Sequence, residues 1–405
     1  MTGRTLLLTL AGPDRPGVTR RLFERLSQYP LVVVDVEQVV IRGQLVLGVL
    51  VAEPPDVPTV LHEVAAAATA IGIELGLAVT ASPGAGERRT PERGRLHVTL
   101  LGSPLRPEAM GALAGCIADH GGNIDRIERL AAYPVTAIEL LVSGAEPAVL
   151  RPALAAVGAR VGFDVAVQRA GLHRRGKRLV VMDVDSTLIQ GEVIEMLARR
   201  AGCEAEVAGL TAAAMRGEID FEESLVRRVA LLQGLPVEAI HAVRAELELA
   251  PGARTMVRTL KALGFRCGIV SGGFTQITDA LVADLDLDFA AANTLEVVDG
   301  VVTGRLVGTV VDRAEKAAAL ERFAAQEGVP LAHTVAIGDG ANDLDMLDRA
   351  GLGVAFNAKP MVREAADASL TVPYLDTILF LLGITREEIE SAESDDGLDV
   401  AAVTR

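Results

Sequence analysis

The 405-residue sequence has no tryptophan, only three cysteines and few aromatic residues. Because Cys116, Cys203 and Cys267 are few and widely separated, they form no disulfide framework, and we expect a protein of the reducing cytoplasm. Long apolar runs are also lacking, since the longest, such as residues 379–384, are far shorter than a membrane span. The apolar start at residues 4–10 lacks a small-residue cleavage site, which favours a strand over a signal peptide.

Positively charged residues are also fewer than negatively charged ones. Lysine and arginine together number 39 against 54 aspartates and glutamates, which gives a net charge of -15. Such a chain repels nucleic acids and anionic membranes, so we expect neither as a partner. A phosphorylated substrate would therefore need cations gathered at its own site. Apolar residues are abundant, at 50%, and the length is sufficient for two or three domains.

Two stretches that combine glycine with arginine interrupt the apolar pattern. Stretches of this composition are typical of linkers, and we expect their charges to be solvated. The acidic C-terminal end is expected to be a solvated tail. The predicted order is a first domain (1–81), a linker (82–95), a second domain (96–168), a linker (169–177), a large third domain (178–390) and the tail (391–405).

Each of the first two domains shows the order β-α-β-β-α-β, and the second repeats the first at an offset of about ninety residues. This order is that of a ferredoxin-like α+β unit, so the chain contains an internal duplication. In the first copy the loop GPDRPG, residues 12–17, leads directly into a helix. Glycine there lets a ligand approach free N–H groups, although a tight turn that only starts a helix is the alternative.

Both copies resemble ACT domains, which bind amino acids and regulate metabolic enzymes. The resemblance rests on the repeated unit and, most strongly, on the stretch GPDRPGVTRRLFERL of the first copy. The resemblance implies an amino-acid effector such as L-serine, held near Asp14 and Gly17. It also implies a homodimer, because ACT domains often bind ligand between paired copies. The second copy has Glu108 in place of the glycine, which leaves its own ligand capacity open.

The third domain alternates short apolar strands with amphipathic helices, which predicts a doubly wound parallel sheet covered on both faces. Polar groups follow three of its strands: Asp183 and Asp185, then residues 271–273, then residues 338–343. Lys316 lies near the start of the helix that precedes the last strand. Because open α/β sheets place their sites at the carboxyl edge, we expect these groups to meet there.

Phosphate ester hydrolysis needs such a set: a nucleophile in line, a cation for the non-bridging oxygens and an acid for the leaving oxygen. The motifs DVDST, SGG, the lysine and GDGAND resemble, in this order, those of the haloacid dehalogenase superfamily of aspartate-based phosphatases. The resemblance implies that Asp183 is the nucleophile, Asp185 the general acid and base, and Lys316 a source of positive charge. It also implies that the phosphoryl group is bound by Ser271, Gly272, Gly273 and Asn342.

A magnesium ion follows from the same resemblance, because Mg²⁺ prefers oxygen ligands and shares substrate phosphates. Its ligands would be a carboxylate oxygen of Asp183, the backbone carbonyl of Asp185 and the side chain of Asp339, with Asp343 close outside this set. The cation would also allow the clustered carboxylates to stay ionised.

A helical insertion at about residues 189–250 follows the nucleophile motif and resembles the small cap of this superfamily. Counting 100° per residue from Phe221, Arg228 falls at about -20°, beside Leu225 at about 40°. Arg228 therefore lies on the apolar stripe of its helix, whereas Arg227 faces away, and a guanidinium on that stripe needs an anionic partner. An internal glutamate and a substrate carboxylate are both candidates for that partner.

With this cap, the set of Glu192, Met215, Phe221 and Arg228 resembles the phosphoserine phosphatase family. The resemblance implies that Glu192 holds the substrate ammonium, that Arg228 holds its carboxylate, and that the apolar pair walls the pocket. The expected activity is hydrolysis of O-phospho-L-serine as the last step of serine synthesis, with feedback through the ACT domains. Two alternatives are an enzyme that hydrolyses or transfers the phosphate of another small phosphomonoester, and an amino-acid-binding regulatory protein with an inactive phosphatase domain.

Overall fold

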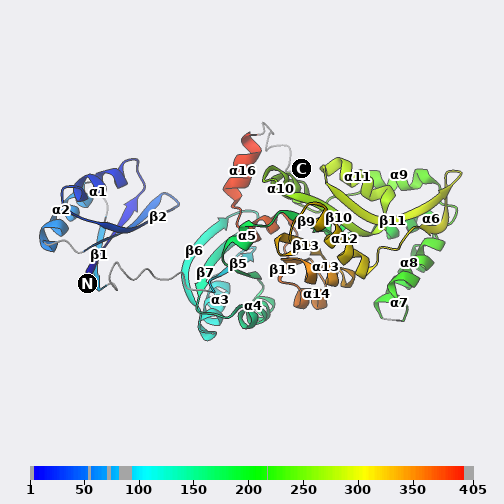
Figure 1. Ribbon diagram of the computed structural model, residues 1–405, viewed down its shortest axis with the longest axis horizontal. Helices are drawn as coiled ribbons and strands as arrows, with labels where there is room; N and C mark the ends of the chain where they lie inside the picture. The colour runs from blue at the N-terminus through cyan, green and yellow to red at the C-terminus, as the bar shows by residue number, and fades with distance from the viewer. Residues whose placement is uncertain (1–3, 53–55, 71–73, 82–93, 217, 396–405) are drawn as a thin grey trace. The chain divides into compact units, whose positions relative to one another are not determined.

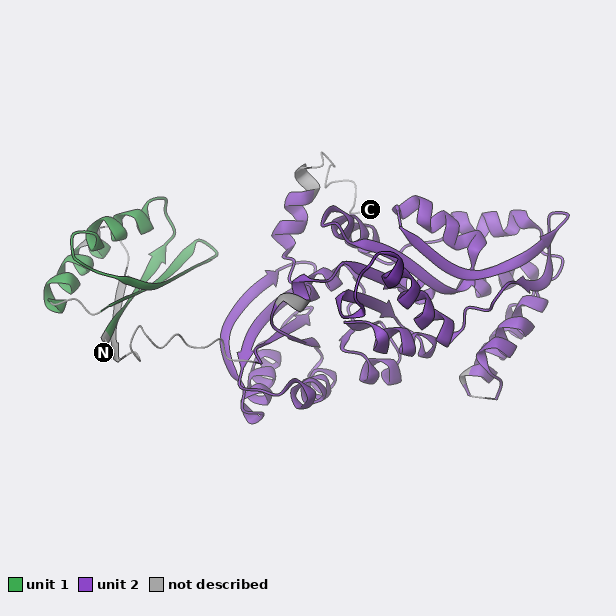
Figure 2. Cartoon of the chain, viewed as in Figure 1, with its two compact units in different colours: residues 1–93 green, residues 94–405 purple. Residues whose placement is uncertain are grey.

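The computed structural model describes residues 4–52, 56–70, 74–81, 94–216 and 218–395. The chain forms two compact units, residues 1–93 and 94–405 (Figure 2). Most of the predicted linker 82–95 and most of the predicted tail 391–405 lie outside the described residues. Within the described part of the chain, no helix combines the length and the apolar character needed to cross a bilayer.

The first unit is an antiparallel sheet of four strands with two helices, in the order that the sequence predicts (Figure 1). Its strand order is β2-β3-β1-β4. Side chains alternate along the strands, so Leu6, Leu8 and Leu47 share one core, onto which α1 packs Val18 and Leu22. The elements are β1 (Arg4–Pro13), α1 (Val18–Leu26), β2 (Val33–Ile41), β3 (Gln44–Ala52), α2 (Val57–Ala70) and β4 (Glu74–Ala81).

The second unit begins with a copy of the same topology, in which β5 pairs with β7 and β8, and β6 lies at the edge. The N-cap of α3 is Arg106, whereas the N-cap of α1 is Gly17, because α3 begins earlier relative to its buried face. Glu108 lies one residue before the buried Ala109, just as Gly17 lies one residue before the buried Val18. The elements are β5 (Leu96–Gly102), α3 (Pro107–Asp119), β6 (Asn123–Ala131), β7 (Thr136–Ser143), α4 (Pro147–Val161) and β8 (Asp164–Arg169).

A doubly wound α/β domain forms the rest of the second unit, as predicted. Strands β11, β10, β9, β13, β14 and β15 are parallel neighbours in this order, and β12 adds an antiparallel edge. After the four-residue helix α5 (Leu172–Arg175), the strands are β9 (Leu179–Met182), β10 (Arg266–Phe274), β11 (Phe289–Val298), β12 (Val301–Val307), β13 (Thr334–Gly338), β14 (Gly353–Phe356) and β15 (Ala368–Leu370).

Helices cover both faces of this sheet. Leu179 and Val181 of β9 face α12, α13 and α14, whereas Val180 and Met182 face the larger core that includes α10, α11 and α15. Period-two alternation in a strand buried on both sides explains why all four residues of β9 are apolar. The helices outside the cap are α10 (Ala253–Ala262), α11 (Thr275–Leu285), α12 (Arg313–Gln326), α13 (Leu344–Arg349), α14 (Pro360–Ala365), α15 (Ile378–Leu381) and α16 (Arg386–Asp395).

The second ACT-like copy and the α/β domain share one continuous sheet. Strand β8 lies antiparallel beside β15, with Ala166 opposite Ala368 and Val165 opposite Ser369. The result is an eleven-stranded sheet in the order β12-β11-β10-β9-β13-β14-β15-β8-β5-β7-β6. The sequence does not predict this continuity, because the pairing joins strands about 200 residues apart.

The segment 169–177, predicted to be a linker with solvated charges, carries two buried cations. Arg174 pairs with Glu139 of β7 and donates hydrogen bonds to the carbonyl oxygens of Leu381 (2.9 Å) and Phe380 (3.2 Å). Lys177 donates to the carbonyl oxygens of residues 332 and 334, and burial lowers its pKa to about 8. The prediction of solvation is therefore wrong for these two residues, which are buried.

Four helices form a cap between β9 and α10: α6 (Val193–Ala201), α7 (Glu204–Met215), α8 (Phe221–Ala230) and α9 (Val237–Glu246). Where the chain enters and leaves the cap, Ile189 bridges Leu249. The turn between α8 and α9 is fastened to the β11–β12 hairpin, because the Gly234 N–H donates to Val302 (2.8 Å) and the Val237 N–H to Gly300 (2.9 Å). The cap is thus attached to the α/β domain at two places.

Candidate active site

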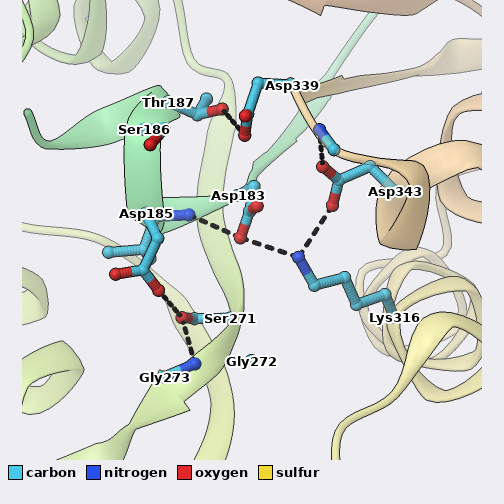
Figure 3. Close-up of polar contacts among 12 residues, drawn as sticks. Asp183, Asp185, Ser186, Thr187, Ser271, Gly272, Gly273, Lys316, Asp339 and Asp343 are labelled. Atoms are coloured by element: carbon cyan, nitrogen blue, oxygen red, sulfur yellow. Dashed lines mark hydrogen bonds and ion pairs between the residues drawn. The ribbon is translucent and has the colours of Figure 1, made fainter. Parts of the chain in front are cut away.

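The predicted motifs meet at the carboxyl ends of β10, β9 and β13, which are neighbours in the sheet. Asp183 directly follows β9, Ser271 lies in β10, and Asp339 directly follows β13. Figure 3 shows these side chains converging, with Lys316 entering from α12. Parallel strands bring their ends to one edge, and this is why motifs distant in sequence form one site.

Asp183 is buried at the centre of the site. Its Oδ1 accepts hydrogen bonds from the Val184 N–H (2.8 Å) and from Lys316 Nζ (2.8 Å). Burial and the nearby Asp343 raise the pKa of Asp183 well above its usual range, against the opposing effect of Lys316. Asp183 therefore stays ionised only if positive charge in the site compensates its burial and the repulsion from Asp343.

Lys316 supplies part of that charge. Its side chain is 0% exposed, and Nζ contacts Asp343 Oδ1 at 2.7 Å as well as Asp183. Although burial alone lowers it, these two carboxylates raise the pKa of Lys316 above its usual range. A buried amine between two carboxylates stays protonated and fixes both in place.

Asp185 occupies the turn η1 (Val184–Leu188), which begins directly after Asp183. Its Oδ1 accepts from the Val193 N–H (2.7 Å) and its Oδ2 from Ser271 Oγ (3.2 Å). Burial, with repulsion from Glu192, raises the pKa of Asp185 to about 6. A Cβ at Gly273 would lie 3.0 Å from Asp185 Oδ2, so this close approach requires glycine.

The turn η1 also positions two hydroxyl groups. Ser186 has the left-handed φ of 58°, and its Oγ donates to Glu192 Oε1 (3.0 Å). Thr187 Oγ1 donates to Asp339 Oδ1 (3.3 Å). Local strain at a non-glycine residue is thus retained where it aims side chains into the site.

One group of carboxylates could hold a cation: oxygens of Asp183, Asp339 and Asp343 lie within 4.8 Å of one another. Asp343 already uses both oxygens, one for Lys316 and one for the Gly340 N–H (2.9 Å). Among the described residues, Asp183 and Asp339 have hydrogen bonds on Oδ1 alone, which leaves Oδ2 of each for a cation. Burial and Asp343 raise the pKa of Asp339 to about 7, and this all-oxygen set fits Mg²⁺.

A cavity of about 490 Å³ lies between these carboxylates and the cap. Arg228 of α8 faces it, whereas its neighbour Arg227 is exposed and pairs with Glu223, as the helical spacing predicts. The side chain of Met215 lies outside the described part of the structure, and Ser271 and Lys316 are buried beneath the cavity. The predicted site residues that line it are Asp183, Asp185, Glu192, Phe221, Arg228, Gly272, Gly273, Asp339 and Asn342.

Three contributors were not identified from the sequence. Asn293 of β11 donates to the Gly272 carbonyl (2.8 Å) and accepts from the Val311 N–H (2.8 Å), so it ties the end of β10 to the segment between β12 and α12. Thr211 of α7 places its Oγ1 3.5 Å from Arg228 Nη1. Thr187 could have been identified because it lies within the DVDST motif. No local pattern marks Asn293 or Thr211.

The predicted effector residues belong to the first unit. Gly17 is the N-cap of α1, with a left-handed φ of 90°, and apart from its chain neighbours no atom of the described residues lies within 4 Å of where its Cβ would be. Asp14 is exposed, and its N–H donates to the Gly43 carbonyl (2.8 Å). The start of α1 is therefore open to a small ligand, as far as the described residues show.

Family models match three parts of the chain. A haloacid dehalogenase-like hydrolase model matches residues 180–348, and ACT domain models match residues 4–79 and 96–168. The phosphoserine phosphatase of Streptomyces coelicolor is 60% identical over 96% of this chain and 95% of its own. That of Mycobacterium tuberculosis is 56% identical over 97% of this chain and 96% of its own.

Solved structures agree with these matches. A probable phosphoserine phosphatase from Vibrio cholerae, in unliganded form, has a TM-score of 0.58 and 34% identity, covering 73% of this chain and 88% of that one. A haloacid dehalogenase family hydrolase from Salmonella enterica serovar Typhi has a TM-score of 0.63 and 28% identity, covering 71% of this chain and 98% of that one.

Proposed function

Since the chain belongs to the phosphoserine phosphatase family of haloacid dehalogenase-like hydrolases, we propose that it hydrolyses O-phospho-L-serine to L-serine and phosphate. The observation that carries the proposal is that Glu192 and Arg228 line the same cavity as Asp183 and Asp185. A carboxylate and a guanidinium beside a phosphate-handling site match a substrate that bears an ammonium, a carboxylate and a phosphate.

In the first step an oxygen of Asp183 attacks phosphorus in line, and the bond between phosphorus and the serine oxygen breaks. Asp185 gives its proton to that leaving oxygen. Its pKa of about 6 supports this role, because a carboxyl group with a raised pKa can still be protonated near neutral pH. The product of this step is an aspartyl phosphate on Asp183.

In the second step a water molecule attacks phosphorus while Asp185, now ionised, takes its proton. The bond between phosphorus and Asp183 breaks, which restores the carboxylate and releases phosphate. Ser271 and the backbone of Gly272 and Gly273 would hold phosphoryl oxygens together with Asn342. Lys316 would compensate the charge that develops on them.

Magnesium belongs to the proposal as the cation of the site. Asp183, Asp339 and the backbone carbonyl of Asp185 would hold it. Asp343 would not bind the ion directly but would position these ligands through its contacts with Lys316 and the Gly340 N–H. When bound, the ion supplies positive charge to the non-bridging phosphoryl oxygens and keeps the clustered carboxylates ionised.

Substrate choice would depend on the cap. Within the described residues, Arg228 has only weak hydrogen bonds, to the Ser224 carbonyl (3.4 Å) and Thr211 (3.5 Å), so its guanidinium can bind a carboxylate. Glu192 would receive the ammonium. Phe221 lies close to the phosphate loop, since a Cβ at Gly272 would be 3.2 Å from its ring, and it would wall the pocket with Met215.

The test is phosphate release from O-phospho-L-serine with Mg²⁺. Asp183→Asn should lower kcat on the order of 10⁴-fold or more, because it removes the nucleophile. Arg228→Ala should raise KM at least about tenfold through loss of a charged hydrogen bond. Arg227→Ala is the matched control, since this neighbour is exposed and paired with Glu223.

Phosphoethanolamine separates the proposal from its rivals. It has the ammonium and phosphate but no carboxylate, so Arg228→Ala should leave its turnover nearly unchanged. If the wild type hydrolyses other phosphomonoesters but not phosphoserine, the substrate assignment is wrong and the superfamily chemistry remains. If it hydrolyses none with Mg²⁺ present, the chain is a regulatory protein and not an enzyme.

Feedback by an amino acid such as L-serine is part of the proposal, with Asp14 and Gly17 marking the effector site. The open start of α1 supports it, because free N–H groups at a helix start attract a carboxylate. Inhibition by L-serine should disappear in Gly17→Ala while basal turnover stays. Equal inhibition of both forms would mean simple product competition.

The proposal also includes a cytoplasmic homodimer. Sedimentation measures the mass of the assembly and so tests the dimer.

A further inference from the structure

Lysine is rare in this chain, and one lysine differs from the rest. The sequence has four lysines, at positions 177, 261, 316 and 359. Lys177 and Lys316 are buried, and Lys261 pairs with Asp288 at 3.0 Å. Lys359 is exposed, and its ammonium has no hydrogen-bond or ion-pair partner among the described residues. It is the free ammonium of this set.

Lys359 lies at the rim of the catalytic cavity, on the phosphate side. It lines the cavity together with Asp339, Gly340 and Asn342, and its N–H donates to the Asp339 carbonyl (3.4 Å). The residue is the N-cap of α14 and precedes Pro360, which keeps its backbone extended, at φ -63° and ψ 152°. The side chain therefore starts from a fixed point beside the candidate cation site.

The charges around the cavity are mostly negative. Five carboxylates line it, from Asp183, Asp185, Glu192, Glu195 and Asp339. Two other cations line it: Arg313 forms an ion pair with Asp345, and Arg228 belongs to the cap helix α8, where the proposed function assigns it to the substrate carboxylate. A dianionic phosphate that approaches this mouth from solvent would meet repulsion unless a free cation offsets it.

We propose that Lys359 captures the phosphate group of the incoming substrate at the rim of the cavity, and so raises kcat/KM without taking part in the chemical steps. The inference rests on the proposed function, since it assumes an anionic phosphate ester. Lysine suits this task because its ammonium is a compact charge on a flexible four-carbon stem, which can follow the phosphate inward. The net charge of -15 makes such a local cation more valuable here than in a neutral protein.

The experiment compares Lys359→Gln and Lys359→Arg with the wild type at saturating Mg²⁺, in 20 mM and 500 mM salt. At low salt, Lys359→Gln should lower kcat/KM for phosphoserine by about fivefold to tenfold, with kcat unchanged. At high salt the loss should shrink to about twofold or less, because salt screens charges at an exposed rim. Lys359→Arg should retain most of the wild-type value.

Arg126→Gln is the matched control for the loss of one positive charge. Arg126 is exposed, pairs with Glu128 at 2.9 Å, and belongs to β6. This strand is five positions from β14 in the sheet, on the order of 24 Å, which exceeds the screening length of roughly 22 Å at 20 mM salt. We expect its kcat/KM to match the wild type at both salt concentrations.

Two results would overturn the inference. One is an unchanged kcat/KM in Lys359→Gln at low salt, and the other is a fall in kcat that is equal at both salt concentrations, which would assign Lys359 to the chemistry or to the fold. Binding of inorganic phosphate, measured by calorimetry, tests the same idea without turnover: Lys359→Gln should bind it more weakly at low salt. If the wild type hydrolyses no phosphomonoester, the proposed function fails, while the phosphate-binding comparison still decides the role of Lys359.

Discussion

The two ACT domains have one topology but differ in what they are joined to. The first, residues 4–81, encloses a core of its own, and the chain divides into compact units just after it. The second, residues 96–168, extends the catalytic sheet through the pairing of β8 with β15. The comparison teaches that a duplicated module can remain self-contained in one copy and become part of an enzyme's framework in the other.

A few polar contacts secure the second copy. Asp164 at the start of β8 accepts from the Thr371 N–H (2.6 Å), the Thr371 hydroxyl (2.9 Å) and the Val372 N–H (3.2 Å). Gln168 at the other end donates to the Leu381 carbonyl (2.7 Å). These bonds fix the register of the β8–β15 pair, which brings apolar side chains of both domains into one core.

Deleting the two domains in turn should give the largest difference. Removal of residues 1–93 should leave Tm and basal turnover of the second unit nearly unchanged, because that unit has its own core. Removal of residues 1–177 should lower Tm on the order of 10 °C or more, or prevent folding. It strips from the shared core Leu101, Leu130, Ala131, Val135, Ala137 and Ala166. Thermal melts and turnover of both truncated chains test this, and equal melting would show that the shared sheet adds no stability.

Breaking the buried pair at the junction is the next largest change. Arg174→Ala should lower the free energy of unfolding by about 3 kcal/mol, because it leaves the partly buried Glu139 with His97 as its remaining partner. The adjacent Arg175 is exposed, so Arg175→Ala is the matched control and should have little effect. Urea unfolding measures both. A similar loss in the two variants would mean that the junction is not where the stability lies.

The same pair predicts a pH dependence. Burial alone would raise the pKa of Glu139, but hydrogen bonds from His97 and Arg174 outweigh it and lower the pKa from 4.5 to about 2. A carboxyl group with a depressed pKa stabilises the fold fully above its unfolded value, and this contribution is lost as pH falls through the folded value. The gap in unfolding free energy between wild type and Glu139→Gln should therefore be constant above pH 5 and shrink between about pH 4.5 and pH 2. A gap that stays constant down to pH 3 would contradict the assignment.

The smallest effect should come from an ion pair in the first domain. Arg20 and Glu24 contact each other at 2.7 Å on the surface of α1, and both are exposed. Solvent and side-chain entropy cancel most of the attraction between such groups, so Arg20→Ala should not shift Tm measurably. A loss comparable to that of Arg174→Ala would erase the contrast between the two domains.

Local patterns in the sequence predicted most of the fold and most of the candidate site. The alternation of apolar residues predicted the strands, and the placement of Asp183, Ser271 and Asp339 at strand ends predicted their meeting. Spacing on one helix distinguished Arg228 from Arg227. These features depend on residues close in sequence, or on a rule that holds for all parallel sheets.

Long-range contacts could not be predicted in this way. Arg174 is buried against Glu139 of β7 and the Leu381 carbonyl, and Lys177 against residues 332 and 334, all distant in sequence. A basic stretch that contains glycine carries no local sign of such contacts. Asn293 donates a hydrogen bond to the Gly272 carbonyl on the neighbouring strand, and no sequence pattern around Asn293 indicates this contact. Lys359 acquires significance only when the fold places it beside Asp339.

The hydrogen bonds between the cap and the β11–β12 hairpin connect these two parts mechanically. Strand β11 lies directly beside β10, and its Asn293 holds the Gly272 carbonyl. A displacement of the cap would therefore be transmitted through the hairpin to Gly272, where the proposed function places a phosphoryl oxygen. Under that function, opening of the cap and release of the product phosphate would be coupled.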